Sequence, residues 1–428
     1  MNFDESVKYL YGLGNEVLAM KLGLENISKL LKALGNPEKN YLKVQIAGTN
    51  GKGSTVAFLE SICVNAKINV GATTSPHLIS VTERVRINGE EISEKDFARI
   101  ATIVRETSEQ LVKKGELETV PTYFEQVTAI ALFAFAEAKV ELAILETGLG
   151  GRFDATTAAN AEIVGITPID LDHQRILGET LAEIAAEKAA IIRQDTRVFS
   201  TPQKLEAEKI IYGKSREVGV DLIWTNPQVQ LIEDLGGFCY LSFQTKKNKY
   251  KAEFWMQGKH QWTNATLAIY IAESLRDFGF KISKDNIELG LETTEHKGRL
   301  EFSNGILFDG AHNISGAKAL REYLDENVTQ PITMIFGAMR DKDLTEIAEI
   351  LFSKANKLIL TKPENPRSME TAEIAEFARN DSIYQTETVA EALKIAQEVT
   401  SENELILVTG SLYLVGEAQK ILSETSDL

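Results

Sequence analysis

One short segment constrains the fold more than any other part of this chain. Gly48-Thr49-Asn50-Gly51-Lys52-Gly53-Ser54-Thr55 directly follows the apolar run 44–47. An apolar strand that opens into a glycine-rich turn and a helix suits a polyphosphate, because backbone N–H groups and the helix N-terminus converge on the anion. Lys52 would then neutralise the terminal phosphates, and the Ser54 hydroxyl would hold Mg²⁺. The alternative is a glycine turn with an incidental lysine, which the strand before it and the helix after it disfavour.

The spacing of this segment is G-x-x-G-K-G-S, whereas the standard phosphate loop reads G-x-x-x-x-G-K and would have a glycine where Ile46 stands. The segment is therefore a variant of that loop.

Composition excludes several classes of protein. A chain of 428 residues is long enough for two or three domains. Its net charge of −16 argues against a nucleic-acid or membrane-surface binder, so anionic ligands must meet local basic groups. Two cysteines, Cys63 and Cys239, are too few for a disulfide framework or a Cys-rich metal site. Because a signal peptide and a membrane-length apolar run are both absent from the sequence, we expect a cytoplasmic protein.

Strand patterns alternate with helical patterns along most of the chain. The pattern predicts a doubly wound, mostly parallel α/β sheet, in which ligands bind outside the carboxyl ends of the strands. Alternating residues over 228–256 predict a small antiparallel excursion, with Lys246–Lys249 as a solvated turn. The expected strands cover 42–47, 69–73, 140–145 and 163–167, and the expected helices cover 4–11, 25–34, 54–66, 96–114, 125–138 and 263–278.

The last third of the chain predicts a second, smaller α/β domain. Apolar runs recur at 305–309, 332–336, 358–360 and 405–408, separated by helical stretches. The polar segment Thr293–Arg299 precedes them. We therefore expect one domain over residues 1–296 and a second, Rossmann-like domain over 297–428.

Polar residues at the predicted strand ends are candidate ligands. Glu146 closes one strand and opens a glycine-rich loop, a good position for holding a metal. His173 follows the next strand along the chain, so we expect these two residues at adjacent strand ends. Lys188 lies in an apolar helix, where its residue pattern favours a lysine that extends to solvent or pairs with Glu187.

Taken together, these motifs resemble the folylpolyglutamate synthases, a family of the Mur ligase superfamily that in bacteria often doubles as dihydrofolate synthase. The resemblance runs in order from about residue 40 to 415, and the combination of motifs is specific although each alone is not. Besides the phosphate loop, it rests on Ser75–Leu78, Thr82–Gly89, Glu146–Asp154, Leu171–His173, Glu187–Ala189, Gly298-Arg299, Asp309–Asn313, Asp341–Asp343 and Thr409–Tyr413.

The resemblance implies an ATP-dependent ligase that adds L-glutamate to the γ-carboxylate of a folate or folylpolyglutamate. It places the nucleotide at Gly48, Asn50, Gly51, Lys52, Gly53, Ser54, Asn264, Arg299 and Asp309. It places two Mg²⁺ at Ser54, Ser75, Glu146 and His173, and the pterin at Thr122, Tyr123, Phe124, Glu125, Phe153, Asp154 and Ala155. It places the incoming glutamate near His312 and Ser411, and it implies carbamylation of Lys188, which reverses the interpretation from the residue pattern.

The chemistry suits these residue types. A carboxylate becomes an acyl donor once it carries the γ-phosphoryl group, and that transfer needs positioning and charge neutralisation rather than a protein nucleophile. Lys52, Lys188 and His312 are the residues that we expect to act on the reacting groups. Arg84 and Arg86 are either local positive groups in a flexible loop or solvated surface charges. K⁺ is a further expectation of the family.

Three other readings compete with this one. A cell-wall precursor ligase of the same superfamily carries a full nucleotide-sugar domain before the phosphate loop, and 47 residues are too few for one. A nucleotide-dependent switch leaves the motifs of the second domain unexplained, and a folate-binding module predicts no turnover. The pterin-binding segments serve both reactions, so dihydropteroate stays open as a second substrate. We expect a monomer.

Overall fold

The computed structural model describes residues 1–14 and 23–426, and these form two compact units. The first unit contains Met1–Asp170, Leu177–Glu253 and Thr263–Thr294. The second contains Glu295–Leu428 together with two earlier segments, Leu171–Ile176 and Phe254–Trp262. The domain boundary expected after residue 296 stays a prediction.

The first unit is built on an eight-stranded sheet with the order β4-β3-β2-β5-β1-β6-β7-β8. Its six central and distal strands run parallel, whereas β3 and β4 add an antiparallel edge. The predicted doubly wound, mostly parallel sheet is confirmed. The strands are β1 (Leu42–Ala47), β2 (Val70–Thr73), β3 (Arg86–Ile87), β4 (Glu90–Glu91), β5 (Leu142–Glu146), β6 (Ile163–Ile166), β7 (Arg197–Ser200) and β8 (Leu222–Trp224).

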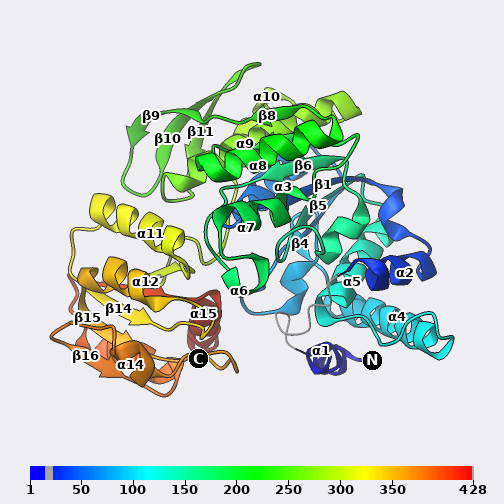
Figure 1. The fold of residues 1–428 in the computed structure, drawn as a ribbon. Helices are drawn as coiled ribbons and strands as arrows, with labels where there is room; N and C mark the ends of the chain where they lie inside the picture. Colours follow the sequence, from blue (N-terminus) through cyan, green and yellow to red (C-terminus); the bar gives the residue numbers. More distant parts are fainter. Residues whose placement is uncertain (15–22, 427–428) are drawn as a thin grey trace. The chain divides into compact units, whose positions relative to one another are not determined.

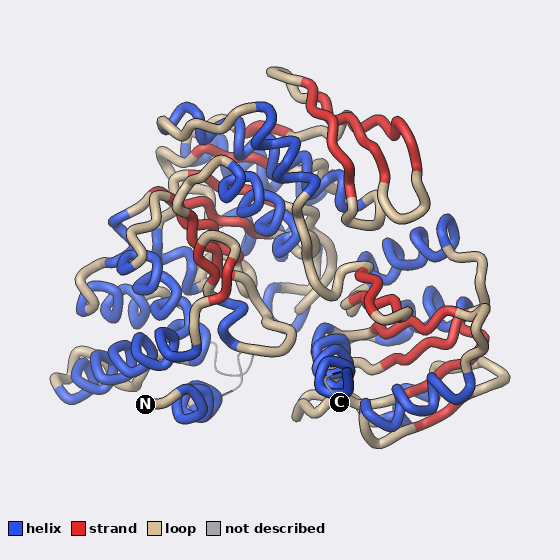
Figure 2. Tube along the Cα trace, turned by 180° about the vertical axis from the view of Figure 1, so that it is seen from behind, coloured by secondary structure: helices blue, strands red, loops and turns tan. Residues whose placement is uncertain are grey.

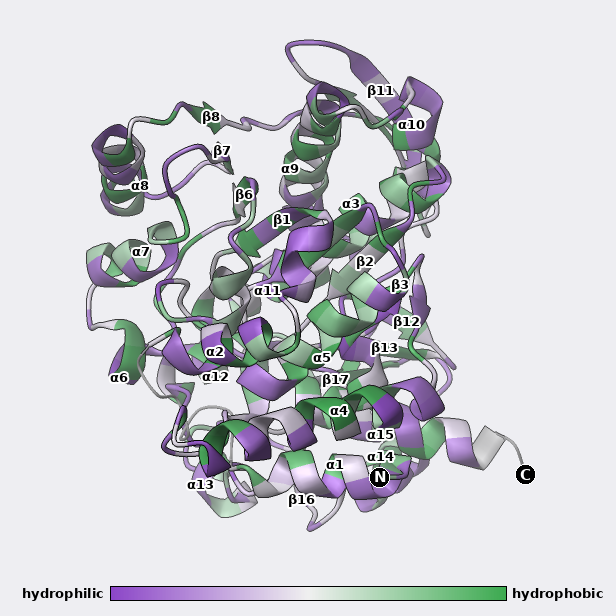
Figure 3. Cartoon of the chain, turned by 90° about the vertical axis from the view of Figure 1, so that its right-hand side faces the viewer, coloured by the Kyte–Doolittle hydropathy of each residue, from purple (hydrophilic) through white to green (hydrophobic). Residues whose placement is uncertain are grey.

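Helices cover this sheet, so most of its strands are buried on both faces, as in parallel sheets generally. The helix α5 is hydrophobic over most of its length and packs in the core (Figure 3). The helices are α1 (Phe3–Gly12), α2 (Glu25–Ala33), α3 (Lys52–Asn65), α4 (Glu94–Lys113), α5 (Tyr123–Glu137), α7 (Leu181–Ala189), α8 (Leu205–Val218) and α10 (Lys284–Glu292). Two more, α6 (Gln174–Leu177) and α9 (His260–Leu275), contain residues of both units.

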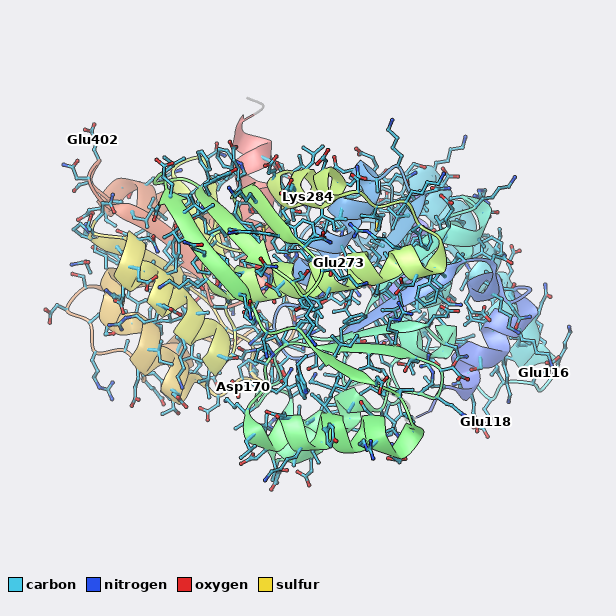
Figure 4. The ribbon with its side chains drawn as sticks, turned by 90° about the horizontal axis from the view of Figure 1, so that it is seen from above. Glu116, Glu118, Asp170, Glu273, Lys284 and Glu402 are labelled. Carbon is cyan, nitrogen blue, oxygen red and sulfur yellow. The ribbon has the colours of Figure 1, made fainter. Side chains whose placement is uncertain are left out.

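A separate three-stranded antiparallel sheet follows β8 (Figure 1). It comprises β9 (Gln228–Asp234), β10 (Cys239–Gln244) and β11 (Lys249–Phe254), which confirms the predicted excursion and its lysine-rich turn. Glu273 of α9, labelled in Figure 4, anchors this turn because its Oε1 accepts hydrogen bonds from Thr245, Asn248 and Tyr250.

The second unit has a six-stranded sheet with the order β12-β13-β17-β14-β15-β16. Helices flank both faces (Figure 2), and only β12 runs antiparallel to its neighbour. Its strands are β12 (Glu301–Ser303), β13 (Ile306–Asp309), β14 (Ile332–Phe336), β15 (Ala355–Leu360), β16 (Ile383–Gln385) and β17 (Leu405–Thr409). Its helices are α11 (Ile314–Asn327), α12 (Leu344–Leu351), α13 (Thr371–Ala375), α14 (Val389–Val399) and α15 (Leu412–Ser426).

Short 3₁₀ helices complete the two units: η1 (Pro37–Asn40), η2 (Val81–Arg84), η3 (Ala155–Ala159), η4 (Arg276–Phe278) and η5 (Phe352–Lys354). Over the described residues, every helix is too short or too polar to cross a membrane.

Candidate functional site

The glycine-rich loop connects the end of β1 to the start of α3. Gly48 has a φ of 151° and Gly51 a φ of 84°, values that L side chains rarely adopt. A Cβ at Gly48 would lie 1.8 Å from Thr167 Oγ1, and one at Gly51 would lie 2.2 Å from Asn264 Oδ1. The loop therefore requires glycine at both positions, and Asn264 lies directly against it.

Two lysines contact the carbonyls of this loop. Lys52 Nζ donates to the Thr49 carbonyl at 3.1 Å, and Lys188 Nζ donates to the Gly48 carbonyl at 2.8 Å. Lys188 is only 5 % exposed, so the interpretation of a solvent-reaching side chain is wrong. Its alternative, a pair with Glu187, is also not what the structure has, because Glu187 pairs with Arg152 at 2.8 Å. A buried amine is thus held against the phosphate loop.

The candidate metal ligands of the first unit lie at neighbouring strand ends. Glu146 is the register partner of Ile46, so it ends beside the phosphate loop, and its Oε2 accepts the Ser75 N–H at 3.0 Å. Ser54 is buried in the first turn of α3. Mg²⁺ prefers oxygen ligands and usually keeps waters and substrate phosphates in its shell. A serine hydroxyl and a buried carboxylate therefore fit this ion, although no group of three or more His, Cys, Asp or Glu that could hold a metal occurs among the described residues.

His173 differs from its expected position. The strands β5 and β6 both pair with β1 and flank it, so the ends that carry Glu146 and lead to His173 are not adjacent in the sheet. Sequence order misled the prediction because parallel strands that follow each other in a chain need not pair. His173 belongs to the second unit, has a φ of 51°, and its N–H donates to Asp172 Oδ1.

The arginines of the 82–89 segment are not solvated surface charges, so that alternative is wrong. Arg86 donates to Glu60 Oε2 from Nε at 2.9 Å and from Nη2 at 2.6 Å. Arg84 is 2 % exposed and its Nε donates to His77 Nδ1 at 2.8 Å. Burial and the Arg84 charge lower the pKa of His77 to about 3, so its ring stays neutral.

The first expected pterin segment forms the start of α5. Thr122 caps the helix, with its N–H donating to Glu125 Oε2 at 2.8 Å. Tyr123 is stacked on Tyr11 with ring centroids 5.7 Å apart. A Cβ at Gly148 would lie 2.5 Å from the Phe124 ring, so that ring packs on the glycine-rich loop after β5. Phe124 is thus placed against that loop.

The second expected pterin segment follows the same loop. Phe153 is 40 % exposed and available to a ligand. Asp154 instead turns inward and accepts hydrogen bonds from Leu149 N and Thr156 N at 2.9 and 3.0 Å. Burial raises the pKa of its carboxyl. Asp154 and the buried Ala155 shape the loop, and Phe153 offers the accessible surface.

In the second unit, Asp309 ends β13 and organises the loop that follows it. Its Oδ2 accepts the Leu300 N–H at 3.0 Å and its Oδ1 accepts the Ala311 N–H at 2.9 Å. Burial raises the pKa of Asp309 to about 6, against the opposing effect of the Arg299 charge. A Cβ at Gly310 would lie 3.3 Å from Arg299 Nη1. Arg299 and Asp309, both expected at the nucleotide, therefore lie together.

The same unit gathers a buried polar cluster around Asp172. Lys342 Nζ donates to Asp172 Oδ1 at 2.5 Å and Asn313 Nδ2 donates to Oδ2 at 3.0 Å, while His312 Nε2 lies 3.9 Å from Oδ2. Burial would raise the pKa of Asp172, but the adjacent Lys342 charge holds it below its usual range. Burial and the Lys342 charge lower the pKa of His312 to about 3. His312 is thus a neutral ring held next to an ion pair.

Comparison with known proteins decides the family. Residues 46–272 match the Mur ligase middle domain, and residues 298–412 match the Mur ligase glutamate ligase domain. The chain is 32 % identical over 420 residues to the dihydrofolate synthase/folylpolyglutamate synthase of Bacillus subtilis, which covers 96 % of this chain and 97 % of that protein. The chain belongs to the folylpolyglutamate and dihydrofolate synthases of the Mur ligase superfamily.

Solved structures of this family share the fold of the chain. Mycobacterium tuberculosis folylpolyglutamate synthase complexed with ADP has a TM-score of 0.90 at 27 % identity, covering 98 % of each chain. E. coli FolC in complex with DHPP and ADP has a TM-score of 0.87 at 26 % identity, covering 100 % of this chain and 99 % of that one. The family resemblance and the fold class are confirmed.

Within this folylpolyglutamate synthase fold, sequence reasoning gave no role to Asp172 or Lys342. Both lie in motifs that carried the resemblance, but only the structure shows that residues 170 positions apart form one ion pair. Each side chain is 9 % exposed. In the sequence, both residues stand next to other charged or polar residues of these motifs. That pattern marks them as candidates for a polar site, but it does not show that they pair with each other.

Proposed function

We propose that this protein is an ATP-dependent ligase that joins L-glutamate to the γ-carboxylate of folate or folylpolyglutamate. The observation that carries the proposal is the phosphate loop with two lysines on its carbonyls, in a chain that matches this family over nearly its whole length. A cell-wall ligase and a nucleotide switch are both less well supported, because the curated relatives and structural neighbours are folylpolyglutamate or dihydrofolate synthases.

The reaction begins with binding of ATP at the phosphate loop. The N–H groups of the Gly48–Ser54 segment would surround the phosphates and Lys52 would neutralise the γ-phosphate. The family resemblance assigns Asn264, Arg299 and Asp309 to the rest of the nucleotide. A folate carboxylate oxygen bonds to the γ-phosphorus while the bond between that phosphorus and the ADP oxygen breaks. This step requires no protein nucleophile. Lys52 supports it by neutralising the negative charge of the phosphoryl group.

Two Mg²⁺ would be held by Ser54, Ser75, Glu146 and His173, and when bound they neutralise charge on the phosphates. We propose that Lys188 is carbamylated. Its modified nitrogen keeps one N–H that can still donate to the Gly48 carbonyl, while the two new oxygens form an anion. Such an anion attracts a cation that an ammonium repels. K⁺ is a further expected requirement.

The second step joins the amino acid. The amine of glutamate attacks the acyl carbon, phosphate leaves with the bonding electrons, and the amine loses one proton. Because His312 Nδ1 lies 2.8 Å from the Gly310 carbonyl, which can only accept, Nδ1 carries the proton and Nε2 keeps a lone pair. A neutral His312 can therefore accept an N–H from the incoming amine, and Ser411 offers a hydroxyl to the same substrate.

The test is an assay of ADP release with folate and glutamate added singly and together. The ligase predicts ADP release that needs both, with one amide product per ADP. A switch would hydrolyse ATP without either substrate, and a binding module would release no ADP.

Replacing folate with dihydropteroate in the same assay decides whether the protein is also a dihydrofolate synthase. Size-exclusion chromatography with light scattering tests the expected monomer.

Lys188→Ala tests the carbamate. We expect activity to fall by about 100-fold or more, because an anion near the metals is lost. Short carboxylic acids such as acetate should restore a large part of it in Lys188→Ala and none in Lys52→Ala. Failure of rescue, together with unmodified density at Lys188 in a crystal structure, would contradict carbamylation.

A further inference from the structure

A buried glutamine contacts the glycine-rich loop that follows β5. Gln45 lies in β1 and is completely buried. Its Nε2 lies 2.7 Å from Thr157 Oγ1, 3.0 Å from Thr156 Oγ1 and 3.3 Å from Thr147 Oγ1. The first two hydroxyls belong to η3 and the third comes directly after β5. One side chain of a central strand therefore contacts both ends of this loop.

The direction of these hydrogen bonds follows from the groups to which the threonine hydroxyls donate. Thr157 Oγ1 lies 2.7 Å from the Gly151 carbonyl oxygen, which can only accept. Thr156 Oγ1 lies 2.5 Å from Asp154 Oδ1, an oxygen that also accepts the Thr156 N–H. Because a hydroxyl has a single hydrogen, both threonines donate to the loop and accept from Gln45. The amide of Gln45 must therefore present its NH₂ group to them.

The two groups that accept from the threonines also close the turn that carries Phe153. Asp154 N donates to the Gly151 carbonyl at 3.2 Å, so the chain reverses over four residues with Phe153 near the tip. The threonine hydroxyls thus hold the first and the last residue of this turn, and Gln45 orients both hydroxyls.

The amide oxygen of Gln45 indicates that this arrangement costs stability. Gln45 Oε1 is buried and lacks a hydrogen-bond partner in the part of the chain that the structure describes. A buried acceptor without a partner is unfavourable, and most such groups in folded proteins are paired. An unbranched apolar side chain of similar volume would avoid this cost. Local rules of packing are most often broken at functional sites, so the glutamine points to a role other than stability.

We propose that Gln45 is a positioning residue for the folate substrate. By orienting the hydroxyls of Thr156 and Thr157, it fixes the turn that presents the ring of Phe153 to the pterin. Gln45 is buried and acts only through the turn, whereas Phe153 is 40 % exposed and can stack on a planar ligand. This inference rests on the proposed ligase function.

Gln45→Met is the main test because it removes the NH₂ group and keeps the volume of the side chain. We expect the KM for folate to rise about 3- to 10-fold, the range for a misplaced aromatic contact. The kcat and the KM for ATP should stay within about twofold, which excludes an effect through the phosphate loop that begins three residues later. The melting temperature should equal or exceed that of wild type, because the unpartnered oxygen is gone.

Phe153→Ala shows whether Gln45 acts through this ring. On its own, Phe153→Ala should raise the KM for folate by about the same factor. Adding Gln45→Met to Phe153→Ala should then change this KM by less than about twofold, because the two residues act as one unit. Fully additive effects would mean that Gln45 acts elsewhere and would overturn the proposal.

Thr157→Val is a second variant, which removes the link to Gly151 and leaves β1 unchanged. It should raise the KM for folate by about the same factor as Gln45→Met. Ser108→Ala is the matched control, because Ser108 is also completely buried in the first unit and its hydroxyl donates to the Val104 carbonyl at 2.8 Å. This control should lower the melting temperature and leave the KM for folate within about twofold.

The two melting and KM measurements together separate a positioning role from a structural one. A residue that only stabilises the fold would give Gln45→Met a lower melting temperature and an unchanged KM for folate. That result, or a rise in the KM for ATP in place of folate, would overturn the inference. Wild-type protein without folate-dependent turnover would instead overturn the proposed function on which the inference rests.

Discussion

Lys52 is the lysine of the phosphate loop that we expect to neutralise the γ-phosphate. Its ammonium lies 3.1 Å from the Thr49 carbonyl, so it folds back over the phosphate loop. We expect Lys52→Ala to lower kcat about 10²- to 10³-fold, because Lys52 stabilises the negative charge of the phosphoryl group during its transfer. The melting temperature should stay within a few degrees of the wild-type value. Lys113→Ala, an exposed lysine at the end of α4, is the control. Turnover similar to wild type in Lys52→Ala would refute its role.

Asp309 makes the stability of the protein depend on pH, and the direction of its pKa shift sets the sign of that dependence. Its pKa is about 6 in the fold and 3.8 as a free group, so its protonated form is favoured by folding. Its contribution to stability is complete below pH 4 and is lost as the pH rises through 6. The shift corresponds to about 3 kcal/mol. Urea unfolding from pH 4 to 7 should therefore show the stability of wild type relative to Asp309→Asn falling by up to that amount.

A surface aspartate provides the control of opposite sign. Hydrogen bonds from Lys354 and Arg321 lower the pKa of Asp325. Its contribution is therefore present above pH 4 and lost as the pH falls through its lowered value. The difference between wild type and Asp325→Asn should therefore stay constant from pH 4 to 7, where the Asp309→Asn difference shrinks, and should fall only below pH 4. Parallel curves for the two variants would contradict the assigned pKa of Asp309.

At the scale of elements, the β1–α3 connection depends on glycine. We expect Gly48→Ala to destabilise the protein by at least about 1–2 kcal/mol, because its Cβ would overlap Thr167 Oγ1 at an unfavourable φ. Gly213→Ala is the matched change in the middle of α8, with open space around the new Cβ. It should stabilise by about 0.5–1 kcal/mol. Denaturant unfolding measures both, and equal effects would show that the loop tolerates a side chain.

The central elements could be predicted because each is a local pattern. The strand expected at 42–47 is β1 itself, and the helix expected over 96–114 became α4 at Glu94–Lys113. Short edge strands such as β3, with two residues, carry too little hydrophobic signal for such a prediction. Their formation depends on pairing with β2, a contact that local periodicity does not contain.

At the scale of the whole molecule, the order of strands in the sheets and the pairing of distant residues could not be predicted from the sequence. The insertion of β1 between β5 and β6 separated two predicted ligands that chain order had made neighbours. The segment Leu171–Ile176 belongs to the second unit although it lies inside the range expected for the first domain. Both results follow from tertiary packing, which brings together residues more than a hundred positions apart. Functional motifs were recognisable, whereas their partners were not.

The net charge of −16 makes a final prediction about the whole molecule. ATP, folate and glutamate are all anions, so long-range repulsion slows their approach even though Lys52 and Arg299 attract them locally. Raising the ionic strength from about 0.01 to about 0.15 M shortens the Debye length from about 30 to about 8 Å, which screens the distant charges first.

We therefore expect kcat/KM for the folate substrate to rise about two- to fivefold over this range, while kcat at saturation stays constant. NaCl should set the ionic strength at fixed KCl and free Mg²⁺, because both cations are expected to bind. A steady fall of kcat/KM would mean that the local basic groups, not the net charge, control encounter with the substrates.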